Sequence, residues 1–175
     1  TWSNERAVEV PVVWRLVEER AGGRVLEVGN VLGHYFPRRH TVIDKFERAP
    51  GVVNADAADH DTPRRYDLIV SISTLEHVGF DEEPREAGKP LRAVANLTRL
   101  LAPGGLLCAT IPLGYNPHLD ALLESGALAW TRRLALRRVT RGNRWREASW
   151  EDVRGSRYDE PWVGASAVVI GFRQG

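Results

Sequence analysis

The stretch Arg24-Val-Leu-Glu-Val-Gly-Asn-Val-Leu-Gly33 decides the expected fold. Its apolar run from Val25 to Val28 carries one acidic residue, Glu27, and breaks at Gly29. This pattern predicts a short buried strand over 24–29 that opens into a glycine-containing turn. Ligands of parallel α/β sheets bind outside the carboxyl ends of such strands. Because a glycine permits a positive φ and brings a ligand close to the backbone, we expect any cofactor to bind at this turn.

Strands and helices alternate along the rest of the chain. Apolar runs predict further strands over 41–44, near 52–53, over 66–72 and over 106–111. The clearest of these is 66–72. Helical periodicity predicts helices over 11–21, 91–101 and 119–139. A late pair of strands, 145–153 and 165–172, is typical of an antiparallel edge, and the acidic loop 79–90 is a candidate lid. This order predicts a three-layer α/β sandwich, with residues 1–175 forming one domain.

Composition and charge exclude several classes of protein. The formal net charge is +1, so no global field attracts nucleic acid or a membrane. The single cysteine, Cys108, excludes an internal disulfide and a cysteine-based zinc site. No apolar run approaches the ~20 residues of a membrane span, and no secretory signal is visible, so a cytoplasmic protein is expected. No metal is expected either, because metal-ligand spacing is absent among His34, His40, His60 and His118.

Three polar positions after the predicted strands carry candidate chemistry. Asp44 ends the strand 41–44, and its two carboxylate oxygens match the adjacent hydroxyls of a ribose. Asp56 could accept from an exocyclic amine while the N–H of Ala57 donates to a ring nitrogen. His77 follows the strand 66–72 and is a candidate proton acceptor. Each position also has a plain structural interpretation: a solvated strand end, a polar loop and a histidine that merely lines a site.

The glycine spacing discriminates between cofactors. Gly29 and Gly33 are separated by three residues, and Val31 stands where a dinucleotide fingerprint has its second glycine. Pyrophosphate must approach the backbone closely at that glycine, so the pattern disfavours NAD and tolerates an adenosine compound without phosphates. Lys45 leaves NADP open. The arginine-rich segment 132–146 could bind phosphates or RNA, and a solvated helix face is its alternative interpretation.

Together these stretches resemble the class I S-adenosylmethionine-dependent methyltransferases. The resemblance spans about 24–113. Within the family, the sequence is similar to a bacterial branch found beside glycan-building enzymes. It implies a mostly parallel seven-stranded sheet of order 3-2-1-4-5-7-6 whose last strand is antiparallel. It also implies S-adenosyl-L-methionine as cofactor, S-adenosyl-L-homocysteine as product, and no metal. The residues that carry it are 25–29 with Gly33, Asp44, Asp56-Ala57, 66–70 with 75–78, and 100–106.

The resemblance also implies residue roles. Asp44 would hold the ribose, and Asp56 and Ala57 would meet the adenine. Ile72 and Ser73 would line the cofactor from the strand 66–72. The methionyl part would be surrounded by Glu27, Gly29, Asn30 and Gly33. Val31 departs from the glycine that this family usually has.

On this basis we expect methyl transfer to a small molecule, sugar or glycan, with oxygen preferred over nitrogen as the accepting atom. His77 is the first candidate for the base and His118 the second, and Tyr115 and Asn116 are candidates for the acceptor side. A monomer or a homodimer is expected, without a nucleic-acid partner. The alternatives are an NAD(P)-dependent oxidoreductase, a non-catalytic adenosyl-binding module and an RNA methyltransferase.

Overall fold

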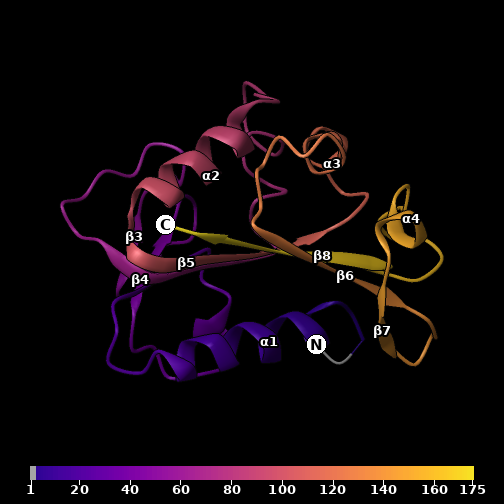
Figure 1. Cartoon of the computed structure of the whole chain (residues 1–175), viewed down its shortest axis with the longest axis horizontal. Coiled ribbons are helices and arrows are strands. Elements are labelled where there is room, and N and C mark those ends of the chain that lie inside the picture. The colour runs from indigo at the N-terminus through magenta and orange to yellow at the C-terminus, as the bar shows by residue number, and fades with distance from the viewer. Residues whose placement is uncertain (1–2) are drawn as a thin grey trace.

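Strand β4 (Tyr66–Ile72) lies in the middle of an eight-stranded sheet (Figure 1). The structure is a computed structural model that describes residues 3–175. The sheet has the order β3-β2-β1-β4-β5-β8-β6-β7. The five strands β1 to β5 are parallel, β8 is antiparallel to β5, and β6 pairs antiparallel with both β8 and β7. The other strands are β1 (Val25–Val28), β2 (Thr41–Asp44), β3 (Val52–Asn54), β5 (Leu101–Pro112), β6 (Arg132–Arg138), β7 (Trp145–Ala148) and β8 (Ala167–Gln174).

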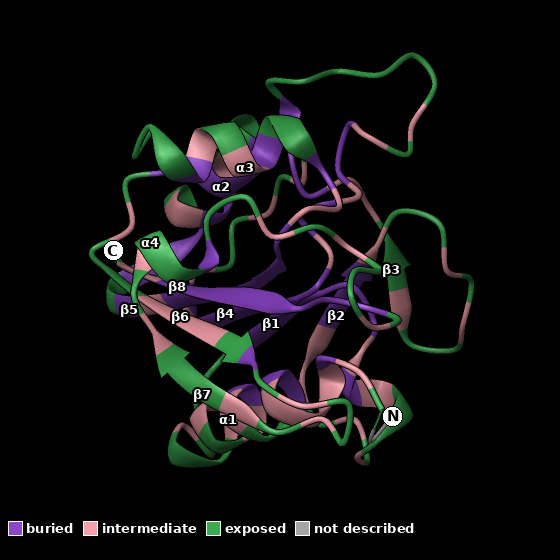
Figure 2. Cartoon of the chain, turned by 90° about the vertical axis from the view of Figure 1, so that its right-hand side faces the viewer, coloured by how far each residue is buried: buried purple, intermediate pink, exposed green. Residues whose placement is uncertain are grey.

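Helices cover both faces of the sheet. Figures 1 and 2 show α1 (Arg6–Glu19) on one face, with α2 (Lys89–Arg99) and α3 (Pro117–Glu124) on the other. A 3₁₀ turn, Leu32–His34, replaces a full helix between β1 and β2, and the short helix α4 (Trp150–Val153) follows β7. Among residues 3–175, no helix combines the length and apolar character needed to cross a lipid bilayer.

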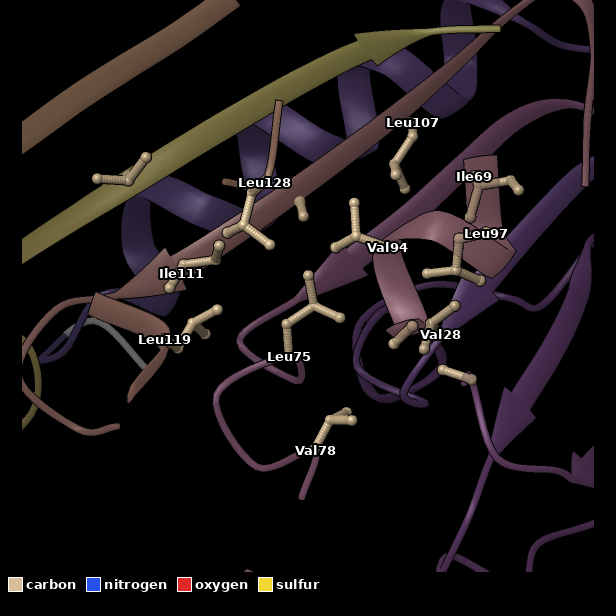
Figure 3. Packing of buried hydrophobic residues seen from close by; sticks show 14 of the residues in the cluster. Val28, Ile69, Leu75, Val78, Val94, Leu97, Leu107, Ile111, Leu119 and Leu128 are labelled. Carbon is tan, nitrogen blue, oxygen red and sulfur yellow. The ribbon is translucent and has the colours of Figure 1, made fainter. Parts of the chain in front are cut away.

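The alternation of side chains along β4 divides the core into two layers. Leu68, Val70 and Ile72 pack in the cluster that includes Val10 and Val13 of α1. Ile69 packs in the other cluster, with Val94 and Leu97 of α2 (Figure 3). Because successive strand residues point to opposite faces, a strand covered on both sides needs a continuous apolar run. This requirement explains why 66–72 was the clearest strand in the sequence.

The order of the sheet agrees with the expectation from the sequence, and the number of strands does not. Strands β3, β2, β1, β4 and β5, followed by β8 and β6, reproduce the predicted order 3-2-1-4-5-7-6. The added eighth strand, β7, pairs with β6 through Ala135–Arg138. Both edge strands are short: β3 has three residues and β7 has four, of which Arg146 and Glu147 are exposed.

Three predicted elements were wrong in type or extent. The helix predicted over 119–139 is α3, which ends at Glu124, and then strand β6. The strand predicted over 145–153 stops at Ala148, because Ser149 and Asp152 form a capping box that starts α4. Helix α1 begins at Arg6 and not at Pro11, so the proline lies inside the helix, where its buried neighbours Val10 and Val13 hold the segment against the sheet.

Candidate functional site

A cavity of about 530 Å³ opens at the carboxyl ends of β1, β2 and β4. This volume lies in the range of small-molecule sites, and parallel strands direct their carboxyl ends to one edge, where such sites form. The cavity wall brings together seven of the predicted site residues: Gly29, Asn30, Asp44, Asp56, Ala57, Ser73 and His77.

The turn after β1 is shaped by close packing at Gly29. Its φ is +82°, and a Cβ there would stand 2.2 Å from Thr74 Oγ1. Glycine is therefore required by the neighbouring loop as well as by the backbone conformation. Val31 has ordinary helical dihedrals, φ −82° and ψ −49°, so the backbone at this position does not require glycine. Gly33 lies outside the cavity wall, where a Cβ would stand 2.3 Å from Asn30 Oδ1.

Glu27 supports this turn from behind and does not line the cavity. Its side chain is completely buried; Oε1 accepts from the Leu32 N–H at 2.6 Å and Oε2 lies 2.7 Å from His40 Nε2. Both carboxylate oxygens are therefore engaged by the protein. The structure gives Glu27 a positioning role in place of the direct cofactor contact that the resemblance implied.

Asp44 lies on the cavity wall with one oxygen available. Oδ1 accepts from the N–H groups of Phe46 and Glu47 at 2.8 and 2.7 Å, which fixes the turn after β2. Oδ2 has no hydrogen-bond partner among residues 3–175. Two exposed or half-exposed aromatic rings, Tyr35 and Phe46, stand on the same wall. A polar acceptor beside aromatic surface is suited to a nucleoside, because the base needs a flat apolar contact and the sugar needs acceptors.

Asp56 is held by two lysines. Its Oδ2 lies 2.5 Å from Lys89 Nζ and 2.9 Å from Lys45 Nζ, and its Oδ1 accepts from the Ala58 N–H at 3.0 Å. Burial disfavours the charged form, but the hydrogen bonds from Lys89 and Lys45 outweigh it and hold the pKa of Asp56 at about 2. Both lysines also pair with Glu82 of the loop 79–88, so that loop is tied to the cavity.

The N–H of Ala57 remains available beside Asp56. Ala57 lines the cavity, and within the described chain its N–H donates to no acceptor. A free donor next to a carboxylate is the complement of an adenine edge. Asp56 therefore keeps its predicted place, although its carboxylate already makes three bonds within the protein.

Ser73 adopts a left-handed conformation at the end of β4, with φ +38°. The Thr110 carbonyl and hydroxyl oxygens both accept from its N–H at 3.1 Å, and its hydroxyl donates to Glu9 Oε1 at 2.6 Å. A residue in such a strained conformation persists only where its neighbours hold it there, and such residues are frequent at binding sites. Its neighbour Ile72 is completely buried in the cluster against α1 and does not line the cavity, contrary to the role implied for it.

Arg6 lies on the cavity wall and Glu9 lies behind it, and neither residue was predicted from the sequence. Arg6 lines the cavity, and its Nη1 donates to Glu9 Oε2 at 2.7 Å. Burial raises the pKa of the completely buried Glu9, while Arg6 and Ser73 oppose that shift. The sequence signal was limited to Glu9, an acidic residue between the apolar residues Val8 and Val10.

His77 lies on the cavity wall within a polar group. Its Nδ1 is 2.5 Å from Asp81 Oδ2, and the Tyr115 hydroxyl donates to the same oxygen at 2.8 Å. A carboxylate only accepts, so Nδ1 carries the proton and Nε2 is left as the acceptor. Burial and the hydrogen bond to Asp81 raise the pKa of Tyr115 to about 12.

None of the three predicted acceptor-side residues, Tyr115, Asn116 and His118, lines the cavity wall; Tyr115 reaches it only through its contacts with Asp81 and His77. Asn116 is buried, caps α3 through its Oδ1, and donates from Nδ2 to the Glu76 carbonyl at 2.9 Å, which is a structural role. His118 is an exposed residue in the first turn of α3. Within residues 3–175, no group of three His, Cys, Asp or Glu side chains could hold a metal ion.

The order of the strands and the position of the cavity define the fold of class I S-adenosylmethionine-dependent methyltransferases, so the predicted resemblance is confirmed at the level of the fold. No protein-family model matches the chain, and no curated protein matches it by sequence.

Solved structures with the same fold include two methyltransferases with a TM-score of 0.56. The first is the N-methyltransferase NodS from Bradyrhizobium japonicum WM9 in complex with S-adenosylhomocysteine, with 14% identity over 98% of this chain and 88% of that one. The second is the 1,6-didemethyltoxoflavin-N1-methyltransferase of Burkholderia thailandensis, with 16% identity over 95% of this chain and 78% of that one. A possible histamine N-methyltransferase from Thermotoga maritima has a TM-score of 0.50 at 17% identity, over 95% and 96% of the two chains.

Proposed function

We propose that the protein transfers a methyl group from S-adenosylmethionine to an oxygen or nitrogen atom of a small molecule or sugar. The observation that carries this proposal is the pair of unsatisfied groups on the cavity wall: Asp44 Oδ2, which accepts from no described residue, and the Ala57 N–H, which donates to none. They are the complements of a ribose hydroxyl and an adenine ring nitrogen. The fold shared with solved methyltransferases supports the same conclusion.

The residues present fit the cofactor along the whole wall. Asp44 would hold the ribose, Ala57 and Asp56 the adenine, and Phe46 and Tyr35 would cover its apolar surface. Arg6 would bind the methionyl carboxylate, since only its Nη1 is engaged by Glu9 and a guanidinium offers five donors. When bound, S-adenosylmethionine would supply an electrophilic methyl group on a sulfonium, with a neutral thioether as leaving group.

The chain's own contribution to the reaction lies in alignment and proton transfer. Holding the acceptor in line with the methyl carbon supplies much of the acceleration. His77 would take a proton from the acceptor at Nε2, because Asp81 fixes the proton of the ring on Nδ1. Tyr115, which donates to the same Asp81 oxygen, would orient the pair from the acceptor side.

Isothermal titration calorimetry with S-adenosylhomocysteine and NADPH tests this proposal. We expect S-adenosylhomocysteine to bind and NADPH not to bind. In Asp44→Asn the Oδ1 that fixes the turn is retained, and the ionised Oδ2 is lost. A hydrogen bond to a charged group contributes about 1.5–3 kcal/mol, so the variant should bind roughly ten- to a hundredfold more weakly.

Asp61→Asn is the matched control, because the Asp61 side chain is 84% exposed and does not line the cavity. Its dissociation constant should equal that of the unsubstituted protein. Preferential NADPH binding would indicate an oxidoreductase instead. An unchanged affinity in Asp44→Asn would remove the ribose assignment. Binding without transfer of labelled methyl to any acceptor would indicate a non-catalytic module.

A further inference from the structure

Four rings gather beside the His77 end of the cavity. The centroid of Tyr115 lies 4.7 Å from that of His77, 5.9 Å from that of Phe80 and 5.2 Å from that of Tyr158, all in edge-to-face geometry. They come from three segments far apart in the chain: the turn after β4, the turn after β5 and the loop before β8. We call these four residues the aromatic cluster. Aromatic faces of this kind attract cations.

Carboxylates border the aromatic cluster on two sides. Asp81 bonds His77 and Tyr115, while Glu5 accepts from the Tyr158 hydroxyl at 3.4 Å and from the Ala165 N–H at 2.9 Å. Glu5, at 3% exposure, is nearly completely buried.

Two further acids, Glu9 and Glu76, are buried, and the charges of Glu9 and Glu5 act on Glu76. The cationic groups facing these four acids are few: Arg6 pairs with Glu9, and Arg85 lies over the Phe80 ring near Asp81. Acids therefore outnumber the arginines around this end of the cavity.

Glu76 is the acid with one unpaired oxygen. It is 2% exposed, and its Oε2 is buried with no hydrogen-bond partner among residues 3–175. Its Oε1 lies 3.6 Å from His77 Nε2, so the carboxyl group stands directly behind a ring of the cavity wall. Burial, aided by the charges of Glu9 and Glu5, raises the pKa of Glu76 well above its ordinary value. A buried polar atom left unpaired destabilises the fold, and a bound donor would remove that cost.

We propose that the methyl acceptor is an amine that enters as an ammonium ion, held between the Glu76 carboxyl group and the aromatic cluster. This inference rests on the proposed methyltransferase function and reverses the preference for oxygen expected from the sequence. An alcohol would gain little from these surroundings, because a neutral hydroxyl is not attracted by acids and ring faces as a cation is.

The proton balance of the step fits the residues present. The ammonium gives one proton to His77 Nε2, which leaves a neutral amine with a free lone pair. That lone pair forms the C–N bond while the C–S bond of the sulfonium breaks, and the C–S electron pair stays on sulfur. The products are the methylated ammonium and the neutral thioether, and the proton on His77 passes to solvent. Asp81 stabilises the imidazolium through Nδ1.

Binding of a matched pair of probes, 1-butylammonium and 1-butanol, tests the proposal at pH 7.5 on the S-adenosylhomocysteine complex. The readout is the ¹³C resonance of the Glu76 carboxyl carbon, assigned with Glu76→Gln. We expect butylammonium to shift this resonance saturably, with an affinity at least tenfold higher than that of butanol. Glu76→Gln, which preserves the shape of the side chain, should bring the two affinities within twofold.

Two further variants keep the test decisive. Tyr115→Leu removes a ring from a partly exposed position and should weaken butylammonium severalfold without improving butanol. Glu18→Gln, an exposed change on α1, should leave the preference intact. Equal affinity of the two probes, or binding of neither to a complex that holds S-adenosylhomocysteine, would overturn the amine assignment alone. Failure of the protein to bind S-adenosylhomocysteine would instead overturn the proposed function.

Discussion

Replacing Gly29 with alanine should destabilise the protein through two separable effects. The backbone at Gly29 has φ +82°, and the left-handed conformation costs an L-residue roughly 1–2 kcal/mol. The new Cβ would also stand 2.2 Å from Thr74 Oγ1 and 3.0 Å from Thr74 Cγ2. Overpacking of this kind typically costs about 1–3 kcal/mol, so the free energy of unfolding should fall by about 2–5 kcal/mol in total.

Gly22 isolates the backbone contribution. Its φ is +90°, and a Cβ there would meet no atom within 4 Å. Gly22→Ala should therefore cost only about 1–2 kcal/mol, the strain of the left-handed backbone. Urea unfolding followed by circular dichroism, with a shared slope for all variants, measures the difference between the two alanine variants.

A double-mutant cycle with Thr74→Ala measures the steric contribution directly. Thr74→Ala deletes the two nearest contacting atoms, Oγ1 and Cγ2, and keeps only Cβ at 3.1 Å. Alone it should cost about 1 kcal/mol, because Oγ1 donates to the Ile72 carbonyl at 3.0 Å. In that background, Gly29→Ala should be less costly by about 1–3 kcal/mol. The reasoning is refuted if Gly29→Ala costs no more than Gly22→Ala, or if the coupling energy with Thr74→Ala is zero.

Three further outcomes follow from buried ionisable groups. Burial raises the pKa of Asp120 to about 6, so the folded state holds this proton more tightly than the unfolded chain. The free energy of unfolding should therefore fall as pH rises from about 4 to about 6. Asp120→Asn should flatten that part of the pH profile, measured as the midpoint of urea unfolding. Lys89→Met leaves Asp56 and Glu82 without their buried partner and should cost about 1.5–3 kcal/mol, with faster hydrogen exchange over 79–88; unchanged exchange would contradict the role of Lys89 in tying that loop down. Burial raises the pKa of Cys108 to about 12, so a thiol reagent at pH 8 should label it only as fast as the protein unfolds, and rapid labelling of the native state would contradict its burial.

The parallel half of the sheet could be predicted because each of its strands is specified locally. Residues 66–72 form an apolar run that admits few interpretations. Strand β1 ends at Val28, directly before the glycine from which its end was predicted. The segment 119–139 could not be predicted this way. Gly126, with φ +74°, follows the end of α3, and residues 132–138 become a strand because β8 and β7 pair with them from both sides. Such pairing depends on residues distant in the chain, which a local pattern does not contain.

The candidate site divides along the same line. Asp44, Ala57 and His77 were predictable because each follows a recognisable strand or loop, and all three lie on the cavity wall. The contact between Glu9 and Ser73 joins residues 64 positions apart, and Lys89 reaches Asp56 across 33. No local pattern pairs residues so far apart in the chain, so only the folded structure reveals these contacts.

The two short strands that end the sheet have a consequence for how the protein associates. An open sheet exposes a row of unpaired backbone groups at each end, to which another chain can add a strand. Here one end offers only the three residues of β3, and the other offers the four residues of β7 with the exposed charges of Arg146 and Glu147. Fibre-like stacking through backbone pairing is therefore disfavoured, and self-association of this chain would have to proceed through side-chain contacts between its helical layers.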